Sequence, residues 1–254
     1  MLFDATFGQD VCTHVTKCKS ESLSSLHKTV RFESEAALVS TAMKMIIPKS
    51  ICDVTGIAEF DCNHGIADLV LYKLRPRWEL ADGLQYLSPR WAAALYALPY
   101  RRGFTDEWFA ECNLVTRRRA LRALNEYANA GYCEQMKIKG RWIKVRQPQR
   151  IVSEINAIEA KLRDWQRALI QAARYRAFAH RSWVLLDEAT IKPAIARLDR
   201  FKDLNVGLVS LSTDGIIHHY YMPEKRTPPD AWRFWFANVL IARAVSQDIS
   251  GSTC

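Results

Sequence analysis

Two apolar segments of this chain each contain one acidic residue at a position where a β-strand would bury it. The segments are I-A-D-L-V-L-Y at 66–72 and I-N-A-I-E-A-K-L at 155–162. Both are too apolar for strands with one solvent-facing side, so they predict inner strands of a sheet that is covered on both faces. Acidic side chains are rare in such strands unless a partner compensates their charge. Asp68 and Glu159 therefore constrain both the fold and the chemistry.

The second of these strands also contains a lysine. Side chains alternate between the faces of a strand, so Glu159 and Lys161 point the same way. Burying both is costly unless something compensates, and a divalent cation beside Glu159 would do so. Hard cations such as Mg²⁺ take several oxygen ligands, which makes Asp68 the best candidate for a second acid. The alternative is structural: Asp68 ends a hairpin turn, and Glu159 forms an ordinary ion pair with Lys161.

A predicted helix follows the second strand and adds polar groups to the same region. In R-D-W-Q-R-A-L-I-Q-A-A-R-Y, Gln171 and Tyr175 are four residues apart and share a helix face. Arg167 continues that face one turn earlier. All three side chains are of types that can contact a phosphate group.

The motifs Gly65-Ile66-Ala67-Asp68, Ile158-Glu159-Ala160-Lys161 and Gln171-Ala172-Ala173-Arg174-Tyr175 together resemble the PD-(D/E)XK nuclease superfamily, and within it the RecB-like branch. The resemblance covers about residues 30–84 and 150–222 of the chain. It implies that Asp68, Glu159 and the Ala160 carbonyl hold Mg²⁺ or Mn²⁺. It also implies that Lys161 positions or activates the attacking water. One departure is that G-I-A precedes the acid, where the family more usually has Gly and two apolar residues.

The same resemblance implies a further glutamate on the first core helix. In F-E-S-E-A-A-L-V-S-T-A-M-K, Glu35 lies in line with Leu38 and Ala42, the face that would pack on the sheet. Glu33 lies further round the helix, so Glu35 is preferred. The catalytic set that the resemblance implies is Glu35, Asp68, Glu159, Lys161, Gln171 and Tyr175.

The order of the predicted elements defines the fold class. Helix, strand, strand, insert, strand, helix and strand predict an α/β fold with a mixed central sheet flanked by helices. By the resemblance this is a restriction-endonuclease-like core, discontinuous over 1–84 and 149–254. The interval between Asp68 and Glu159 is far longer than adjacent strands need, so we expect an inserted domain at 85–148.

This insert has the pattern of a winged helix-turn-helix domain. Ser88-Pro89 predicts the start of a first helix, and Thr105 and Thr116 predict the N-caps of two more. Gly131 suits the end of the third helix. A hairpin with Lys139-Gly140-Arg141 at its tip then follows. In winged-helix domains the second helix of the motif enters the major groove of DNA.

Charge is concentrated in the insert. Residues 116–146 hold nine Lys or Arg against two Glu, which gives this window a net charge of +7 out of +9 for the whole chain. Such a cluster predicts contact with phosphates, hence a DNA partner. One alternative is a solvated helix face, and another is a winged helix that binds protein. The predicted nucleic-acid-binding residues are Arg117, Arg118, Arg119, Arg122, Lys137, Lys139, Arg141 and Lys144.

Composition limits the setting. Seven cysteines without a disulfide-like spacing predict reduced thiols and a cytoplasmic protein. Cys12, His14 and Cys18 lack the paired Cys-x-x-Cys spacing of structural zinc sites, so zinc is disfavoured. Nothing in the chain approaches the length of a membrane span, and no secretory signal pattern is present, so we expect no membrane partner.

Two classes of function remain after this reasoning. The first is an Mg²⁺-dependent deoxyribonuclease that docks DNA through the winged helix and cuts it with the α/β core. The second is a DNA-binding regulator or assembly component that has a nuclease-like fold and does not cut. A homodimer or a partner protein in a larger assembly is compatible with both.

Overall fold

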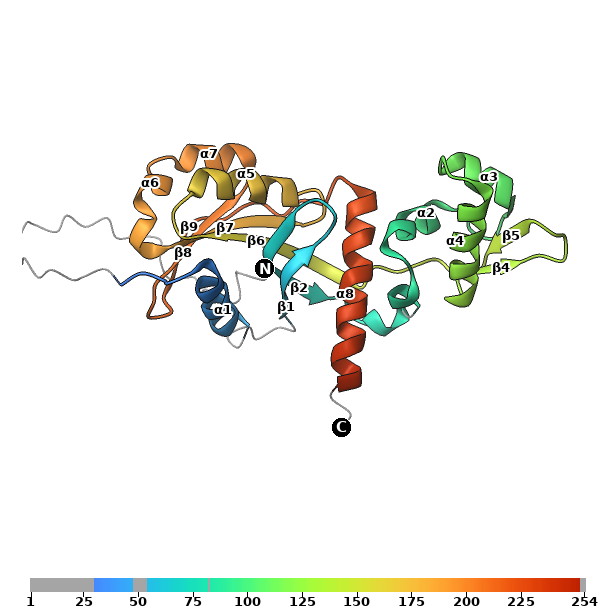
Figure 1. Ribbon diagram of the computed structural model, residues 1–254, viewed down its shortest axis with the longest axis horizontal. Coiled ribbons are helices and arrows are strands. Elements are labelled where there is room, and N and C mark those ends of the chain that lie inside the picture. The colour runs from blue at the N-terminus through green and yellow to red at the C-terminus, as the bar shows by residue number, and fades with distance from the viewer. Residues whose placement is uncertain (1–29, 48–53, 82, 252–254) are drawn as a thin grey trace, which may run out of the picture.

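The computed structural model describes residues 30–47, 54–81 and 83–251 (Figure 1). Cys12, His14 and Cys18, the residues of the disfavoured zinc site, lie outside this part of the chain. No helix within the described residues is both long and apolar enough to cross a membrane.

The core is a six-stranded sheet in the order β1-β2-β6-β7-β8-β9. Strands β1, β2 and β6 pair antiparallel, β6, β7 and β8 pair parallel, and β9 returns antiparallel. The predicted mixed sheet is therefore confirmed. Its strands are β1 (Val54–Asp61), β2 (Ile66–Leu74), β6 (Val152–Lys161), β7 (Arg181–Asp187), β8 (Gly207–Leu211) and β9 (Ile217–Tyr221).

Helices cover both faces of this sheet (Figure 1). On one face, α1 (Glu35–Ile46) buries Leu38, Ala42 and Ile46. On the other face, α5 (Trp165–Tyr175) buries Ala168, Leu169 and Ala172 in the cluster that includes Val184 and Leu186 of β7. The connection after β7 adds η4 (Glu188–Thr190), α6 (Lys192–Ile195) and α7 (Leu198–Leu204) on the α5 side.

Local capping explains where the two helices near the acidic strands begin. The Ser34 hydroxyl accepts a hydrogen bond from the Ala37 N–H at 3.1 Å, which fixes the start of α1. The Asp164 carboxylate accepts from the Arg167 N–H at 3.0 Å and caps α5 directly after β6. Each cap satisfies an N–H that has no partner inside its helix.

The long helix α8 (Ala231–Gly251) lies between the sheet and the insert (Figure 1). Phe234 and Trp235 are buried, so the aromatic run at its start belongs to the core. The Asn238 amide oxygen accepts from the Ile151 N–H at 3.1 Å, which joins the helix to the start of β6. One hydrophobic cluster runs from β1 and β2 through α8 into the insert.

The interval at 85–148 forms the predicted helices and hairpin. Its second sheet has the order β3-β5-β4, with both pairs antiparallel. Thr105 and Thr116 both occupy N-cap positions, but only the Thr105 hydroxyl accepts a capping hydrogen bond. The elements from 78 to 144 are η1 (Trp78–Ala81), η2 (Leu84–Tyr86), η3 (Pro89–Trp91), α2 (Ala92–Ala97), β3 (Gly103–Thr105), α3 (Asp106–Cys112), α4 (Arg117–Asn129), β4 (Cys133–Gln135) and β5 (Arg141–Lys144).

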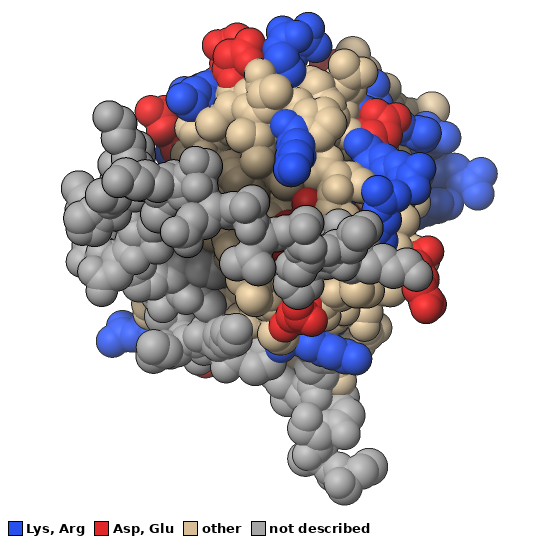
Figure 2. All heavy atoms as spheres, turned by 90° about the vertical axis from the view of Figure 1, so that its left-hand side faces the viewer, with Lys and Arg blue, Asp and Glu red and all other residues tan. Residues whose placement is uncertain are grey.

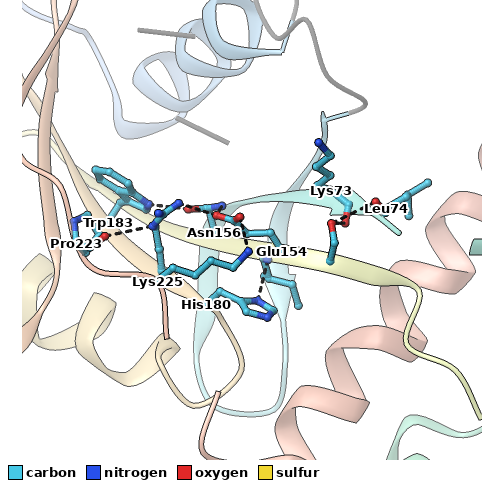
Figure 3. Close-up of polar contacts among 11 residues, drawn as sticks. Lys73, Leu74, Glu154, Asn156, His180, Trp183, Pro223 and Lys225 are labelled. Carbon is cyan, nitrogen blue, oxygen red and sulfur yellow. Dashed lines mark hydrogen bonds and ion pairs between the residues drawn. The ribbon is translucent and has the colours of Figure 1, made fainter. Parts of the chain in front are cut away.

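A buried polar cluster fixes the segment between β9 and α8 to the sheet (Figure 3). The Glu154 carboxylate on β6 accepts hydrogen bonds from Arg181 and Lys225, both at 2.8 Å. The Arg181 guanidinium also donates to the Pro223 carbonyl at 3.1 Å. Because Glu154 is 4% exposed, these contacts hold the segment firmly against the start of β7.

Candidate active site and basic insert

Strand β6 places Glu159 in the interior. Apart from Ser153 and Lys161, every residue of β6 is buried, as the apolar sequence predicts. Glu159 is 1% exposed, and its side chain lies on the α5 side of the sheet, where it reaches Tyr175. Lys161 is the last residue of the strand, so its long side chain reaches the sheet end from this position. The strand thus buries the acid and leaves the lysine at the rim.

Strand β2 brings Asp68 next to Glu159. Leu69 of β2 pairs with Ile158 of β6 in the antiparallel register. Asp68, the residue before Leu69, therefore lies beside Glu159, the residue after Ile158. The Ala160 N–H donates to Asp68 Oδ2 at 2.8 Å. Asp68 is the third residue of β2 and does not end the hairpin turn, so this part of the structural alternative is wrong. Its other part, an ion pair between Glu159 and Lys161, is present at 3.0 Å.

The Lys161 ammonium lies among four oxygen atoms from four residues. Its Nζ is 3.0 Å from Glu159 Oε1, 3.6 Å from Asp68 Oδ2 and 3.0 Å from Glu35 Oε2. It also donates to the Ala160 carbonyl at 2.9 Å. The structure therefore brings together three acids that are far apart in the sequence, and it places Glu35, not Glu33, in contact with the lysine. One positive charge faces three carboxylates, which leaves an excess of negative charge.

Tyr175 joins the helix to both strands. Its hydroxyl lies 2.5 Å from Glu159 Oε2 and 2.7 Å from the Ile66 carbonyl oxygen. Gly65 precedes Ile66 and has a φ of +98°, a backbone conformation that residues with a side chain rarely adopt. The glycine therefore allows the turn that directs the Ile66 carbonyl toward Tyr175. The first and third motifs therefore meet through this hydroxyl.

Electrostatics at this cluster follow from burial and the nearby charges. Burial raises the pKa of Glu159 above its ordinary value of 4.5, and the Asp68 charge raises it further. The Tyr175 hydrogen bond and the Lys161 charge oppose this shift. Burial alone would lower the pKa of Lys161, but its contacts with Glu159 and Glu35 outweigh burial and raise the pKa. Lys161 therefore stays positively charged, while Glu159 binds a proton more readily than an exposed glutamate.

Gln171 is not part of this group. Among the described residues its side chain forms no hydrogen bond with Asp68, Glu159 or Lys161, and its buried amide oxygen has no hydrogen-bond partner. Gln171 instead lines a surface depression of about 410 Å³ together with Arg167 and Arg174. The three residues predicted to share a face of α5 therefore lie in two places. Tyr175 contacts the carboxylate cluster, whereas Gln171 and Arg167 line the surface depression.

A pocket that the sequence did not indicate opens beside Asp68. It has a volume of about 520 Å³, and Val39 and Met43 of α1 and Ala58 of β1 form its apolar lining. Glu59 of β1 also lines it and adopts φ of +51°. The pocket gives the Asp68 side chain, which is 30% exposed, a route to solvent.

The oxygen atoms at this site suit a hard cation. Asp68 and Glu159 supply carboxylates and Ala160 a carbonyl, and the Lys161 ammonium already lies within 3.6 Å of all three residues. The part of the chain that the structure describes has no group of three or more acid, histidine or cysteine side chains arranged as a metal site. An ion here would therefore depend on two carboxylates, one main-chain carbonyl and water, a ligand set that Mg²⁺ accepts.

Most of the predicted basic residues of the insert are exposed. On α4, Arg118, Arg119 and Arg122 project into solvent, and none of them forms an ion pair with a described residue. Lys137, Lys139 and Arg141 of the hairpin are exposed as well. At the sheet end of the molecule, by contrast, Lys and Arg lie among Asp and Glu (Figure 2).

Arg117 differs from its neighbours on α4. Its guanidinium is 3.1 Å from Asp106 Oδ2 and 2.9 Å from Glu107 Oε1, at the start of α3. Asp106 is 1% exposed, and these contacts help to lower its pKa although burial opposes that shift. Arg117 therefore joins α3 to α4 and is less available to an outside partner.

Lys144 is buried, so the prediction that it contacts nucleic acid is wrong. It is 1% exposed, and its ammonium donates to the Leu95 and Tyr96 carbonyls, both at 3.2 Å. These carbonyls belong to the end of α2, so Lys144 caps that helix from inside the insert. Burial lowers its pKa. A signal in the sequence could have shown this, since Lys144 lies two residues after the buried Trp142 and shares its strand face.

A wide groove follows the exposed side of α4. It has a volume of about 1040 Å³ and contains Arg118, Arg122 and Asn125, with Tyr86 of η2 also lining it. Tyr86 is 69% exposed and lines the same groove as the arginines, although it lies 31 positions before Arg117 in the sequence. No pattern in the sequence singles out this tyrosine.

Comparison with known proteins adds no assignment. No protein-family model, no curated protein and no solved structure matches this chain.

Proposed function

We propose that the chain is a metal-dependent nuclease that hydrolyses DNA phosphodiester bonds and docks DNA through the insert. The observation that carries this proposal is the meeting of Asp68, Glu159 and Glu35 around Lys161, with the Ala160 carbonyl in the same group. An ordinary ion pair needs one carboxylate for one ammonium. Three acids around a single lysine, one of them buried, are better suited to binding a cation.

Asp68, Glu159 and the Ala160 carbonyl would hold Mg²⁺ or Mn²⁺. The ion, when bound, would stabilise the negative charge that develops on the phosphate. The chain's own residues prepare this site. The Ala160 N–H fixes one oxygen of Asp68, and the Tyr175 hydroxyl fixes one oxygen of Glu159. Glu159 keeps its other oxygen, Oε1, directed at Lys161, and the fixed Asp68 oxygen itself faces the ammonium.

Lys161 would position the nucleophile. Its raised pKa keeps the ammonium protonated, so it is a hydrogen-bond donor and not a base at neutral pH. A donor at this point can orient a water molecule and neutralise part of the phosphate charge. Glu35 is 46% exposed and holds the lysine from the α1 side, which suits a residue that positions Lys161.

The insert would supply DNA binding as a winged helix-turn-helix domain. Its three helices and three-stranded sheet support this, as does the row of exposed arginines on α4. Helix α4 is the second helix of the helix-turn-helix pair, the element that enters the major groove in such domains. With Arg117 bound to acids and Lys144 buried, the proposed contacts are Arg118, Arg119, Arg122, Lys137, Lys139 and Arg141.

Cleavage assays test the catalytic part of the proposal. Purified wild-type protein is incubated with duplex or single-stranded DNA in the presence of Mg²⁺ or Mn²⁺. The variants Asp68→Asn and Glu159→Gln are assayed in parallel, with Asp203→Asn on the exposed side of α7 as the matched control. We expect cleavage by the wild type and by Asp203→Asn, and at least about a 100-fold loss in the other two variants. Tight binding without cleavage in either metal would reject the nuclease in favour of a DNA-binding regulator.

Salt dependence tests the binding part. Each phosphate contact contributes about 0.9 to the slope of log affinity against log salt, so replacing Arg118, Arg119 and Arg122 with Ala should flatten it by about 1 to 3. A matched triple at Arg197, Arg200 and Lys202, all exposed near α7, should leave the slope unchanged. An equal slope in both triples would remove the insert from DNA binding.

A further inference from the structure

A small cavity lies where the end of α5, the start of β7 and the segment before α8 meet. Its volume is about 170 Å³. Arg176, Arg181 and Arg226 line it, and none of its described lining residues is acidic. It shares no lining residue with the carboxylate cluster. The cavity is thus small, lined by three arginines and separate from the proposed catalytic site.

Ser182 lies against this cavity with an unsatisfied hydroxyl. The residue is 0% exposed, and its Oγ has no hydrogen-bond partner among the described residues. A buried polar atom without a partner destabilises a protein, and native structures rarely leave one without a reason. An acceptor atom bound in the cavity would give this hydroxyl a partner.

The arginines keep donors for such an acceptor. Arg176 donates to the Leu204 carbonyl at 2.8 Å, and Arg226 donates to Glu224 Oε2 at 2.9 Å. A guanidinium has more N–H groups than these bonds use. Arg181 is held by the Glu154 carboxylate and the Pro223 carbonyl, so the base of the cavity is rigid.

The surroundings of the cavity are electropositive. His180 also lines it, and burial lowers the pKa of this residue to about 4. The positive charges of Lys225, Arg150 and Arg181 lower the pKa further, while the charge of Glu154 opposes them. The imidazole is therefore neutral and adds no charge at pH 7. The Asn205 side chain donates to the Glu224 carbonyl at 3.0 Å and accepts from the Glu224 N–H at 2.8 Å, which fixes the segment that closes the cavity.

We propose that this cavity binds a single tetrahedral oxyanion of the phosphate class, with the Arg176 and Arg226 guanidinium groups and the Ser182 hydroxyl as donors. Ligand pockets for larger molecules usually measure about 300–1,000 Å³, so this cavity is too small for a nucleotide and of a size for one phosphate group. Guanidinium groups match the oxygens of a phosphate in geometry and charge. The anion is inorganic phosphate or the terminal phosphate of a nucleic acid.

Calorimetric titration of the full chain with sodium phosphate, against sodium chloride of equal ionic strength, tests the site. We expect phosphate to bind, and Arg176→Gln and Ser182→Ala each to weaken it about tenfold, as for the loss of one hydrogen bond to a charged group. Arg200→Gln, an exposed arginine on α7 outside the cavity, should bind like the wild type. No binding to the wild type, or equal binding to all four proteins, would overturn the proposal.

Ser182→Ala separates a binding role from a structural one. Removing an unsatisfied hydroxyl should leave the unfolding temperature in chloride unchanged or higher, while the increase caused by phosphate should shrink. A lower unfolding temperature in chloride would show that the hydroxyl already has a structural partner, and would overturn its role as a donor.

Two further arms identify the source of the anion and separate this proposal from the nuclease proposal. Tighter binding of 5′-phosphorylated than of 5′-hydroxyl oligonucleotide, with competition by phosphate, assigns the site to a nucleic-acid terminus. Equal binding of both oligonucleotides assigns it to free phosphate. Glu159→Gln should retain phosphate binding, so a failure of DNA cleavage leaves the anion site standing.

Discussion

Replacing Lys161 with Met removes the one positive charge in the acidic cluster with little change in side-chain volume. Breaking a buried ion pair by removing one partner costs about 3–5 kcal/mol. Glu159 keeps its hydrogen bond to Tyr175, and Asp68 and Glu35 are 30% and 46% exposed, so water screens part of the remaining repulsion. We therefore expect Lys161→Met to lower the free energy of unfolding by about 2–3 kcal/mol at pH 8.

This loss should depend on pH. Because the pKa of Glu159 is raised in the folded protein, its contribution to stability is present below 4.5 and is lost as pH rises through the folded pKa. The Lys161 charge opposes the rise in the pKa of Glu159, so removing it raises the pKa of Glu159 in the folded protein further. The pH range over which stability is lost therefore becomes wider in Lys161→Met. As the pH falls toward 4.5, a larger fraction of Glu159 is protonated and needs no counter-charge, so the difference from wild type should be smaller near pH 5 than at pH 8.

Urea denaturation followed by tryptophan fluorescence near pH 5 and pH 8 measures both values. Lys202→Met, an exposed lysine on α7, is the matched control and should change stability by less than about 0.5 kcal/mol. If a cation can replace the ammonium, millimolar Mg²⁺ should stabilise Lys161→Met more than wild type. An equal loss at both pH values would refute the assignment of the effect to Glu159.

Two other substitutions test the packing of the core and the insert. A Cβ at Gly207 would lie 2.1 Å from the ring of the buried Trp183, so Gly207→Ala should lower the free energy of unfolding by about 1–3 kcal/mol or more. The control is Gly103→Ala, because a Cβ there would have the flexible Met136 sulfur as its nearest neighbour, at 3.3 Å. This control should have a small effect in the same denaturation assay. Lys144→Met would remove the ammonium that donates to the Leu95 and Tyr96 carbonyls at the end of α2, of which Leu95 also accepts from the Leu98 N–H, and should lower stability by about 1–2 kcal/mol, measured by thermal unfolding. Since the pKa of Lys144 is lowered by burial, wild type should gain stability as pH rises through that pKa toward 10.5, and the variant should lose this gain.

The sheet and its acids could be predicted because each depends on a local pattern. The apolar runs around Asp68 and Glu159 indicate strands covered on both faces, and the structure has them at β2 and β6. Helical periodicity favoured Glu35 over Glu33, since only Glu35 lies in line with Leu38 and Ala42. The contact between Glu35 and Lys161 follows from this placement of α1 on the sheet.

Features that depend on the meeting of irregular segments could not be predicted. The Ser182 cavity is formed by residues near 176–182, Asn205 and the segment at 226–229, which has no strand or helix period to reveal its path. Tyr86 is the last residue of the short 3₁₀ helix η2, and only the position of η2 relative to α4 brings it into the groove. The burial of Lys144 was not predicted because a charged residue on a hairpin is usually exposed. Here the end of α2 provides two carbonyls that accept hydrogen bonds from its ammonium.

The Tyr175 hydroxyl shows why three distant motifs form one unit. It has a single hydrogen but lies within hydrogen-bond distance of two acceptors, Glu159 and the Ile66 carbonyl. When Glu159 is ionised, the hydrogen is better placed toward the carboxylate, because a charged acceptor binds more strongly. When Glu159 is protonated, it can donate to the tyrosine oxygen, and Tyr175 can then donate to Ile66. The charge of the buried acid therefore determines how firmly α5 holds the turn that leads to Asp68, so the electrostatics and the geometry of the site are set together.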